Sequence, residues 1–190
     1  MSATIDAEKT LVELMLYVAA KCGLDAHYSV LKLNTILFYS DFRAYRTLGE
    51  PITGVEYRKY PHGPAPAMMK ALRKRLFDNE DTFEYINPLP ALIEGMNVTR
   101  LLPRRAADMT LFSSSQIALV DQVIEWLRPM TSSQTRNLSY RHHPGWRLAK
   151  LDEPIPYCAA LLSEDLETQV LSIAERNWAL TVANRFVAGQ

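Results

Sequence analysis

The stretch Leu31–Leu72 constrains the fold of this 190-residue chain more than any other part, because prolines and glycines divide it into separate elements. A helix that is apolar on two faces is expected to run from Ser29, a good N-cap residue, to Gly49. Pro51 then prevents the helix from continuing. A helix that is apolar on two faces is usually the most buried one, so this helix is predicted to lie at the centre of the fold.

A short strand and a proline-rich corner follow this helix. Residues 55–60 alternate as a short strand does. The next six residues, PHGPAP, contain three prolines that exclude a helix before about Ala65. Pro66 is predicted to take the first position of a second helix, which ends at about Phe77. The corner either joins strand to helix or forms a stiff recognition ledge, which would lose little entropy on binding.

Elsewhere in the chain, the periodicity of apolar residues predicts further helices over residues 6–21, 114–128, 132–140 and 164–187. Two capping-box patterns, which begin at Ser113 and Thr131, support the middle two. The β-like runs 82–86 and 98–102 are expected to complete a small antiparallel sheet with the strand 55–60. Together these elements predict a single domain over residues 1–190, mainly α with a small antiparallel β-sheet (α+β), which ends in the helix 164–187.

Composition indicates an ordinary soluble protein, with 48% hydrophobic and 22% charged residues and a net charge of zero. A neutral balance disfavours nucleic acid as the partner. Cys22 and Cys158 lie far apart, in apolar helical settings without a CxxC pattern, which suits core residues in a reducing compartment. No signal-peptide pattern and no membrane-spanning apolar run is read, so a cytoplasmic location is expected.

The sequence predicts no catalytic, cofactor-binding or metal-binding residues. His142 and His143 are adjacent and point apart, and neither they nor His62 have companion ligands at metal-binding spacing. Lys70, Arg73 and Lys74 could contact phosphate, but a solvated helix face is the preferred interpretation. A cysteine–histidine pair stays open as an alternative, because such partners are neighbours in space and not in sequence.

The order of these motifs resembles the Panacea family of toxin–antitoxin antitoxins, which includes the Soc-type antitoxin and its phage-associated relatives. The resemblance covers residues 28–76 and 110–160, with two departures: Thr35 replaces a usual lysine, and Tyr140 replaces a usual histidine. It leaves open whether Tyr140, His142 or His143 has a functional role. The matching residues are Leu37, Phe38, Tyr39 and Asp41 in the helix, Gly49, Pro51, Ile52, Thr53 and Gly54 in the turn, Gly63, Pro64 and Pro66 in the corner, and Ser139, Gly145, Trp146, Ile155, Pro156 and Tyr157 in a second block.

The resemblance implies a compact helical antitoxin domain that binds and neutralises a partner toxin protein directly, without enzyme activity, cofactor or metal. The toxin would be encoded next door. One alternative is a proteolytic adaptor that delivers the toxin to a Clp-type protease, as Soc-type relatives do. A DNA-binding autoregulator and an unrecognised enzyme are further alternatives. Because family members are paired with many unrelated toxins, the scaffold does not encode the class of toxin.

The toxin is expected to dock on the strand 55–60 and the corner after it. The strand is expected to lie at a sheet edge, with backbone groups free for a partner. Tyrosine and arginine often carry interface energy, and the corner restricts motion. The helix after Glu164 is the next candidate, while Leu37 and Trp146 are predicted to lie in the core. The predicted partner-binding residues are Tyr57, Arg58, Tyr60, His62, Gly63 and Pro64.

Overall fold

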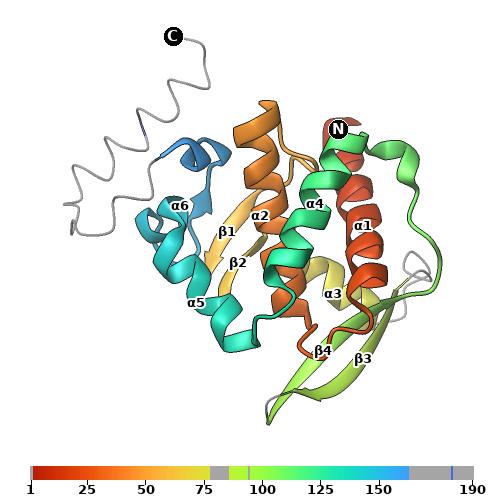
Figure 1. Ribbon diagram of the computed structural model, residues 1–190. Helices are drawn as coiled ribbons and strands as arrows, with labels where there is room; N and C mark the ends of the chain where they lie inside the picture. Colours follow the sequence, from red (N-terminus) through yellow and green to blue (C-terminus); the bar gives the residue numbers. More distant parts are fainter. Residues whose placement is uncertain (1, 78–85, 94, 163–180, 182–190) are drawn as a thin grey trace.

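The computed structural model describes residues 2–77, 86–93, 95–162 and 181 of the chain (Figure 1). Within these ranges the helices are α1 (Ser2–Cys22), α2 (Val30–Leu48), α3 (Met69–Phe77), α4 (Ser114–Leu127), α5 (Ser132–His142) and α6 (Pro144–Leu148), with 3-10 turns η2 (Met109–Leu111) and η3 (Tyr157–Leu161). The strands are β1 (Tyr57–Tyr60), β2 (Gly63–Pro66), β3 (Ile86–Ile93), β4 (Met96–Pro103) and β5 (Pro154–Ile155). The predicted α+β class, mainly helical with small antiparallel sheets, is confirmed.

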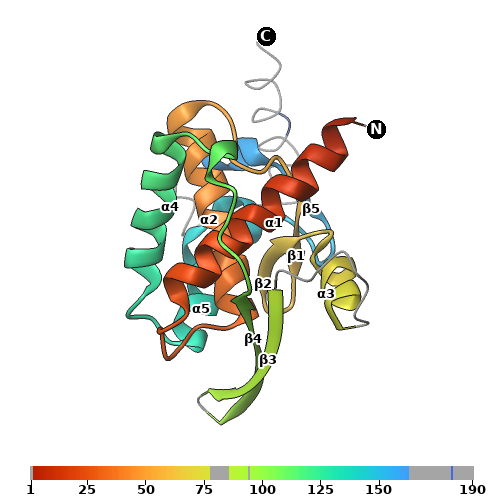
Figure 2. The same ribbon diagram turned by 90° about the vertical axis from the view of Figure 1, so that its right-hand side faces the viewer.

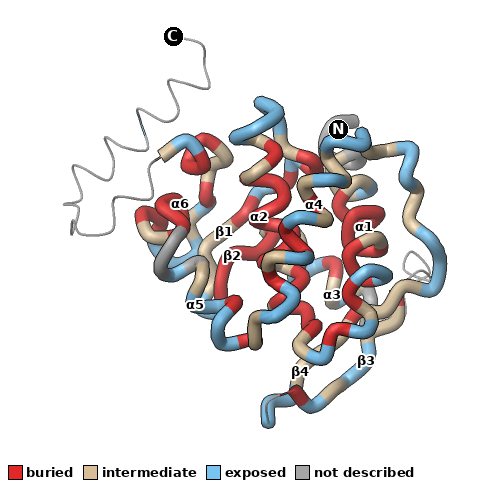
Figure 3. The backbone as a smooth tube through the Cα atoms, viewed as in Figure 1, coloured by how far each residue is buried: buried red, intermediate tan, exposed pale blue. Residues whose placement is uncertain are grey.

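Helix α2 lies at the centre of the fold, as its two apolar faces predict. It begins after Ser29, whose side chain accepts a hydrogen bond from the backbone of Lys32. It ends at Gly49, whose φ of 86° is the left-handed conformation that glycine adopts most readily. Helices α1, α4 and α5 pack on it, and the β1–β2 hairpin covers another side (Figure 1). Twelve of its residues are buried, so α2 supplies the middle of the core (Figure 3).

Strand β1 is the central strand of a three-stranded sheet in the order β2-β1-β5. The predicted edge position of the strand 55–60 is therefore wrong, because β2 and β5 pair with opposite sides of β1. Strand β5 has only two residues and lies about a hundred positions along the chain from β1. Nothing in so short a segment gives a periodic signal, which is why its pairing could not be read from sequence.

The run 98–102, predicted to extend this sheet, does not join it. Residues 86–93 and 96–103 pair with each other as a separate β3–β4 hairpin, which projects from the body (Figure 2). Of the expected strand 82–86, only Ile86 is described, and it begins β3; residues 82–85 lie outside the described part. The hairpin is attached through Arg100, which donates hydrogen bonds to the backbone oxygens of Gly23 and Asp25.

The proline-rich corner is a second strand and not the start of a helix. Residues 63–66 pair with β1 through a two-residue turn, and α3 begins only at Met69, so the prediction that Pro66 opens the helix is wrong. A strand with two prolines is tolerated because β2 is an edge strand. In an antiparallel pair the backbone groups alternate in direction, so the N–H and C=O groups of Gly63 and Ala65 point toward β1. The backbone groups of Pro64 and Pro66 point away from β1, so the N–H that proline lacks is not needed there.

The capping boxes at Ser113 and Thr131 are both present, and they start α4 and α5 as predicted. Leu37 is fully buried and Trp146 is 6% exposed, so their assignment to the core is confirmed. The expected helix 164–187 lies outside the described residues, apart from Thr181. In the described ranges, no helix combines the length and the apolar character needed to cross a membrane.

Candidate functional site

Asp41 organises the loop between α2 and β1. Its carboxyl group is fully buried and accepts hydrogen bonds from the backbone N–H groups of Ile52 and Thr53, at 2.7 and 2.8 Å. The hydroxyls of Thr53 and Tyr57 donate to its second oxygen at 2.5 and 2.7 Å. Burial raises the pKa of Asp41, an effect that the four donated hydrogen bonds partly offset. One side chain on α2 therefore fixes the whole Pro-Ile-Thr-Gly turn and the start of β1.

Tyr140 supports the turn between β1 and β2. Its hydroxyl on α5 donates a 2.6 Å hydrogen bond to the backbone oxygen of Pro61, and its ring packs 4.0 Å from that of Trp146. The ammonium of Lys59 lies 3.9 Å from the Trp146 ring centre and donates to the backbone oxygen of Ala149. The residue that departs from the family pattern thus has a clear position, as a support for the β1–β2 turn.

A groove lies beside this turn, between the start of α2, the β1–β2 hairpin, α3 and β4. Its volume is about 660 Å³, and its wall is more apolar than polar. Val30 and Met69 contribute to the apolar wall, together with Pro64 and Pro66 of β2. A groove of this size can accept several side chains of a ligand or partner.

The groove brings together four of the six residues predicted to bind a partner. Tyr60, His62, Gly63 and Pro64 all line it. Tyr57 is 1% exposed and bonded to Asp41, so its assignment to the docking surface conflicts with its place in the core. Arg58 does not line the groove; its guanidinium donates to Glu56 at 2.6 Å and to the backbone oxygen of Asp152. A strand alternates its side chains between two faces, and the sequence pattern did not show which face was covered.

Residues 33–147 match the family model of the SocA-like antitoxin, Panacea domain. The match spans more than half of the chain. The chain belongs to the SocA-like Panacea family. A search of curated proteins and a search of solved structures each gave no significant match. The family indicates a role in a toxin–antitoxin system.

The Panacea motifs now have physical explanations. Leu37 is in the core, Tyr39 packs edge-on against Trp126, and Asp41 anchors the turn that Pro51 and Gly54 shape. In the second block of motif residues, the side chain of Ser139 lies outside the part of the structure that is described. Pro156 precedes η3, where the hydroxyl of Tyr157 donates 2.6 Å to the backbone oxygen of Val55. This last contact lies outside the matched residues 33–147, yet it secures the same loop.

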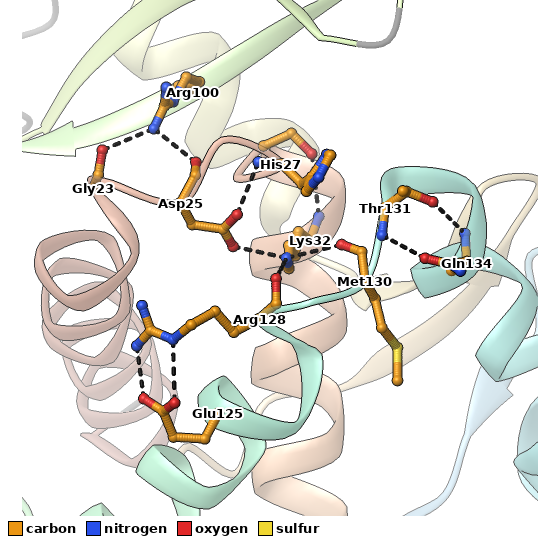
Figure 4. A network of polar contacts seen from close by, with 11 residues as sticks. Gly23, Asp25, His27, Lys32, Arg100, Glu125, Arg128, Met130, Thr131 and Gln134 are labelled. Carbon is orange, nitrogen blue, oxygen red and sulfur yellow. Dashed lines mark hydrogen bonds and ion pairs between the residues drawn. The ribbon is translucent and has the colours of Figure 1, made fainter.

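Lys32 is the polar residue of the Panacea domain that sequence reasoning missed. Its ammonium has no exposed surface, lies 2.7 Å from the Asp25 carboxylate and donates to the backbone oxygens of Arg128 and Met130 (Figure 4). The carboxylate of Asp25 also caps the backbone N–H of His27. A lysine among apolar helix residues ordinarily extends its ammonium to solvent, so the sequence did not indicate that Lys32 is buried. The network ties the start of α2, one wall of the groove, to the loops before it and after α4.

A second cavity of about 690 Å³ lies between α2, α4 and η3. His143 lines it and is buried among the rings of Phe38, Tyr39 and Phe42. Burial lowers the pKa of His143 to about 3, so its imidazole is neutral at physiological pH. Its Nδ1 has no hydrogen-bond partner in the described part of the chain.

The cysteines lack the properties of a catalytic nucleophile. Cys22 and Cys158 are both 2% exposed, which confirms their assignment to the core. Burial raises the pKa of the Cys22 thiol to about 11 and also raises that of Cys158, so both stay protonated at neutral pH. Across the residues that the structure covers, no three His, Cys, Asp or Glu side chains gather as a metal site.

Proposed function

We propose that this protein is a cytoplasmic antitoxin that binds a partner toxin protein directly and blocks it, by contact and without catalysis. Membership of the SocA-like Panacea family supports the toxin–antitoxin role. The single observation that carries the docking site is the groove beside the β1–β2 turn, where Tyr60, His62, Gly63 and Pro64 come together. The toxin docks on this face.

The rigidity of the groove supports a role in binding. Asp41 fixes the entry to β1, Tyr140 holds the turn at Pro61, and Lys32 anchors the start of α2. Groups held in this way lose little conformational freedom when a partner binds, so more of the contact energy becomes affinity. Tyr60 and His62 then present side chains from a preformed wall.

The buried groups support contact over chemistry. A nucleophile and its base need accessible side chains with pKa values near neutrality. The pKa of the Cys22 thiol is raised to about 11 and that of the His143 imidazole is lowered to about 3. Both side chains are buried. The face proposed for the toxin instead combines apolar wall, tyrosine and histidine.

The test is co-expression of this protein with the product of the neighbouring open reading frame. Growth should be restored and the two proteins should co-purify. Tyr60→Ala and His62→Ala should keep the wild-type melting temperature, and we expect at least one to lower toxin affinity by about five- to thirtyfold. Arg136→Ala, on the exposed surface of α5, is the matched control and should bind as wild type does.

Toxin abundance separates sequestration from delivery to a protease. Under direct neutralisation the toxin level stays constant while growth recovers. Rescue that disappears in a strain lacking its Clp-type protease, with the toxin level falling in the parent strain, would establish the adaptor instead. Absence of both rescue and binding would reject the proposal.

A further inference from the structure

The sheet edge at the groove is closed to strand addition. Pro64 and Pro66 face outward on β2 and have no N–H, while Ala67 beyond them already donates its N–H to the backbone oxygen of Glu56. A strand laid along β2 would find acceptors and no donors. A partner therefore has to bind in the groove through side chains, and not as an added strand.

Helix α3 places positive charge along the groove. Its sequence MKALRKRLF contains four cationic residues and no acidic one. Lys70, Arg73 and Lys74 line the groove, whereas Arg75 is paired with Glu8 at 2.6 Å. Lys70 and Lys74 are exposed and make no ion pair with the part of the chain that the structure describes. Among the described residues, the groove thus has a cationic rim at Lys70 and Lys74 without ion-pair partners, beside an apolar wall.

An orphaned acceptor lies on the opposite wall. Asn34 of α2 lines the groove, and its buried Oδ1 has no hydrogen-bond partner among the described residues. A buried acceptor without a partner is destabilising, and an incoming N–H would satisfy it. A bound peptide segment has such donors along its backbone.

We propose that the groove takes a short peptide segment of the toxin that carries apolar side chains flanked by carboxylates. This inference rests on the proposed function and deepens it by naming the chemistry of the partner. The apolar side chains of the segment pack against Val30 and Met69, and its carboxylates lie opposite Lys70 and Lys74. The segment's backbone N–H groups face Asn34. Opposite charges across the rim also speed association and select against basic partners.

Nucleic acid is the competing ligand for a cationic rim, and the geometry favours the peptide. Phosphates require cations but gain nothing from an apolar wall, which is the larger part of this groove. The net charge of the chain is zero, so no broad basic field supports binding of a polyanion. An acidic peptide uses both the wall and the rim.

The decisive experiment measures affinity for the product of the neighbouring open reading frame after charge reversal. The variant Lys70→Glu/Lys74→Glu is compared with Arg136→Glu/Lys150→Glu, which reverses two exposed cations outside the groove. Both variants change the net charge equally. At low salt we expect the groove variant to lose at least tenfold in affinity and the control less than twofold. Raising the salt should weaken the wild type more than the groove variant, because screening acts on the charges at the rim.

The outcomes separate this inference from the proposed function. If wild type binds and neutralises the toxin while both double variants bind equally well, the groove chemistry is wrong and the antitoxin function stands. If wild type neither binds nor rescues, both are wrong. Loss of binding to the operon's promoter DNA in the groove variant, with unchanged toxin affinity, would assign the rim to nucleic acid instead.

Discussion

The hydroxyl of Tyr57 donates a 2.7 Å hydrogen bond to the carboxyl group of Asp41, and neither side chain is more than 1% exposed. Burial and the nearby Asp41 raise the pKa of Tyr57 well above its ordinary value, so the phenol stays protonated and keeps donating through the neutral range. The bond joins the middle of α2 to the central strand of the sheet. Asp41, a position of the family motif, and Tyr57 of β1 are therefore one physical unit.

Removal of Asp41 should be among the most damaging single changes. Asp41→Ala leaves four buried donors without an acceptor, and we expect a loss of about 3–5 kcal/mol in the free energy of unfolding. Tyr57→Phe removes one of the four donors and should cost about 1–3 kcal/mol. Urea denaturation at neutral pH measures both.

Asp121 supplies the matched control for Asp41. It also accepts a tyrosine hydroxyl, that of Tyr17, at 2.8 Å, but its side chain is 41% exposed. Asp121→Ala should therefore cost no more than about 1 kcal/mol. Equal losses for Asp41→Ala and Asp121→Ala would show that the buried network contributes nothing special.

His143 should make stability depend on pH. Its pKa is about 3 when folded and near 6.5 when unfolded, so below pH 6.5 the unfolded chain binds a proton that the folded chain refuses. Stability is therefore complete above pH 6.5 and is lost as the pH falls towards 3. Between pH 6.5 and 5 the loss should reach about 2 kcal/mol. In His143→Phe this part of the pH dependence should vanish.

A substitution at the exposed His62, a histidine outside the cavity that His143 lines, is the control. His62→Gln should keep the wild-type loss between pH 6.5 and 5. Proton NMR gives a check that needs no variant: the imidazole of His143 should not titrate between pH 8 and 5 in the folded protein. An ordinary titration midpoint for His143 would contradict its burial.

Gly145 is required because its neighbours leave no space for a side chain. A Cβ at this position would lie 2.7 Å from both the Ala159 Cβ and the Ile155 Cγ2. Gly145→Ala should destabilise the protein by about 1–3 kcal/mol, since overpacking forces the neighbours apart. Gly23→Ala, whose Cβ would meet nothing closer than 3.5 Å, should change the melting temperature little. A harmless Gly145→Ala would show that α6 can shift away from η3.

The buried pair of Lys32 and Asp25 should behave asymmetrically. Lys32→Met leaves the buried Asp25 carboxylate without its counter-ion and two backbone oxygens without the Lys32 donor, and should cost about 3–5 kcal/mol. Addition of Asp25→Asn removes the unpaired charge and should recover part of that loss. Chemical denaturation of Lys32→Met, Asp25→Asn and the double variant gives the coupling free energy of the pair. Strictly additive losses would mean that the two charges do not interact.

Much of the helical framework could be predicted from the sequence, because local signals define it. Ser29 and Gly49 bracket α2, and the boxes at Ser113 and Thr131 start α4 and α5. Each signal acts within a few residues, where backbone geometry and one side chain decide the outcome. Burial of Leu37 followed from the same periodicity.

The sheet and the groove depend on distant partners, and local patterns do not record them. Pro64 and Pro66 argue against a strand, unless it is known that the strand lies at the edge of the sheet and that both proline nitrogens point away from its neighbour. Tyr57 is a predicted partner-binding residue because neither the pairing of β5 with its strand nor its contacts with Asp41 and Phe38 of α2 can be read from a local pattern. The corner residues Tyr60 and His62 were nevertheless placed together, since they are adjacent to one turn.

The two residues of β5 have a consequence for synthesis of the chain. Until Pro154 and Ile155 leave the ribosome, β1 has a partner on one side only, and its other edge offers unpaired backbone groups. Nascent chains that stop before this point therefore expose a template for intermolecular pairing. The sheet can close only after these two residues are made, so termination before Pro154 yields an aggregation-prone fragment.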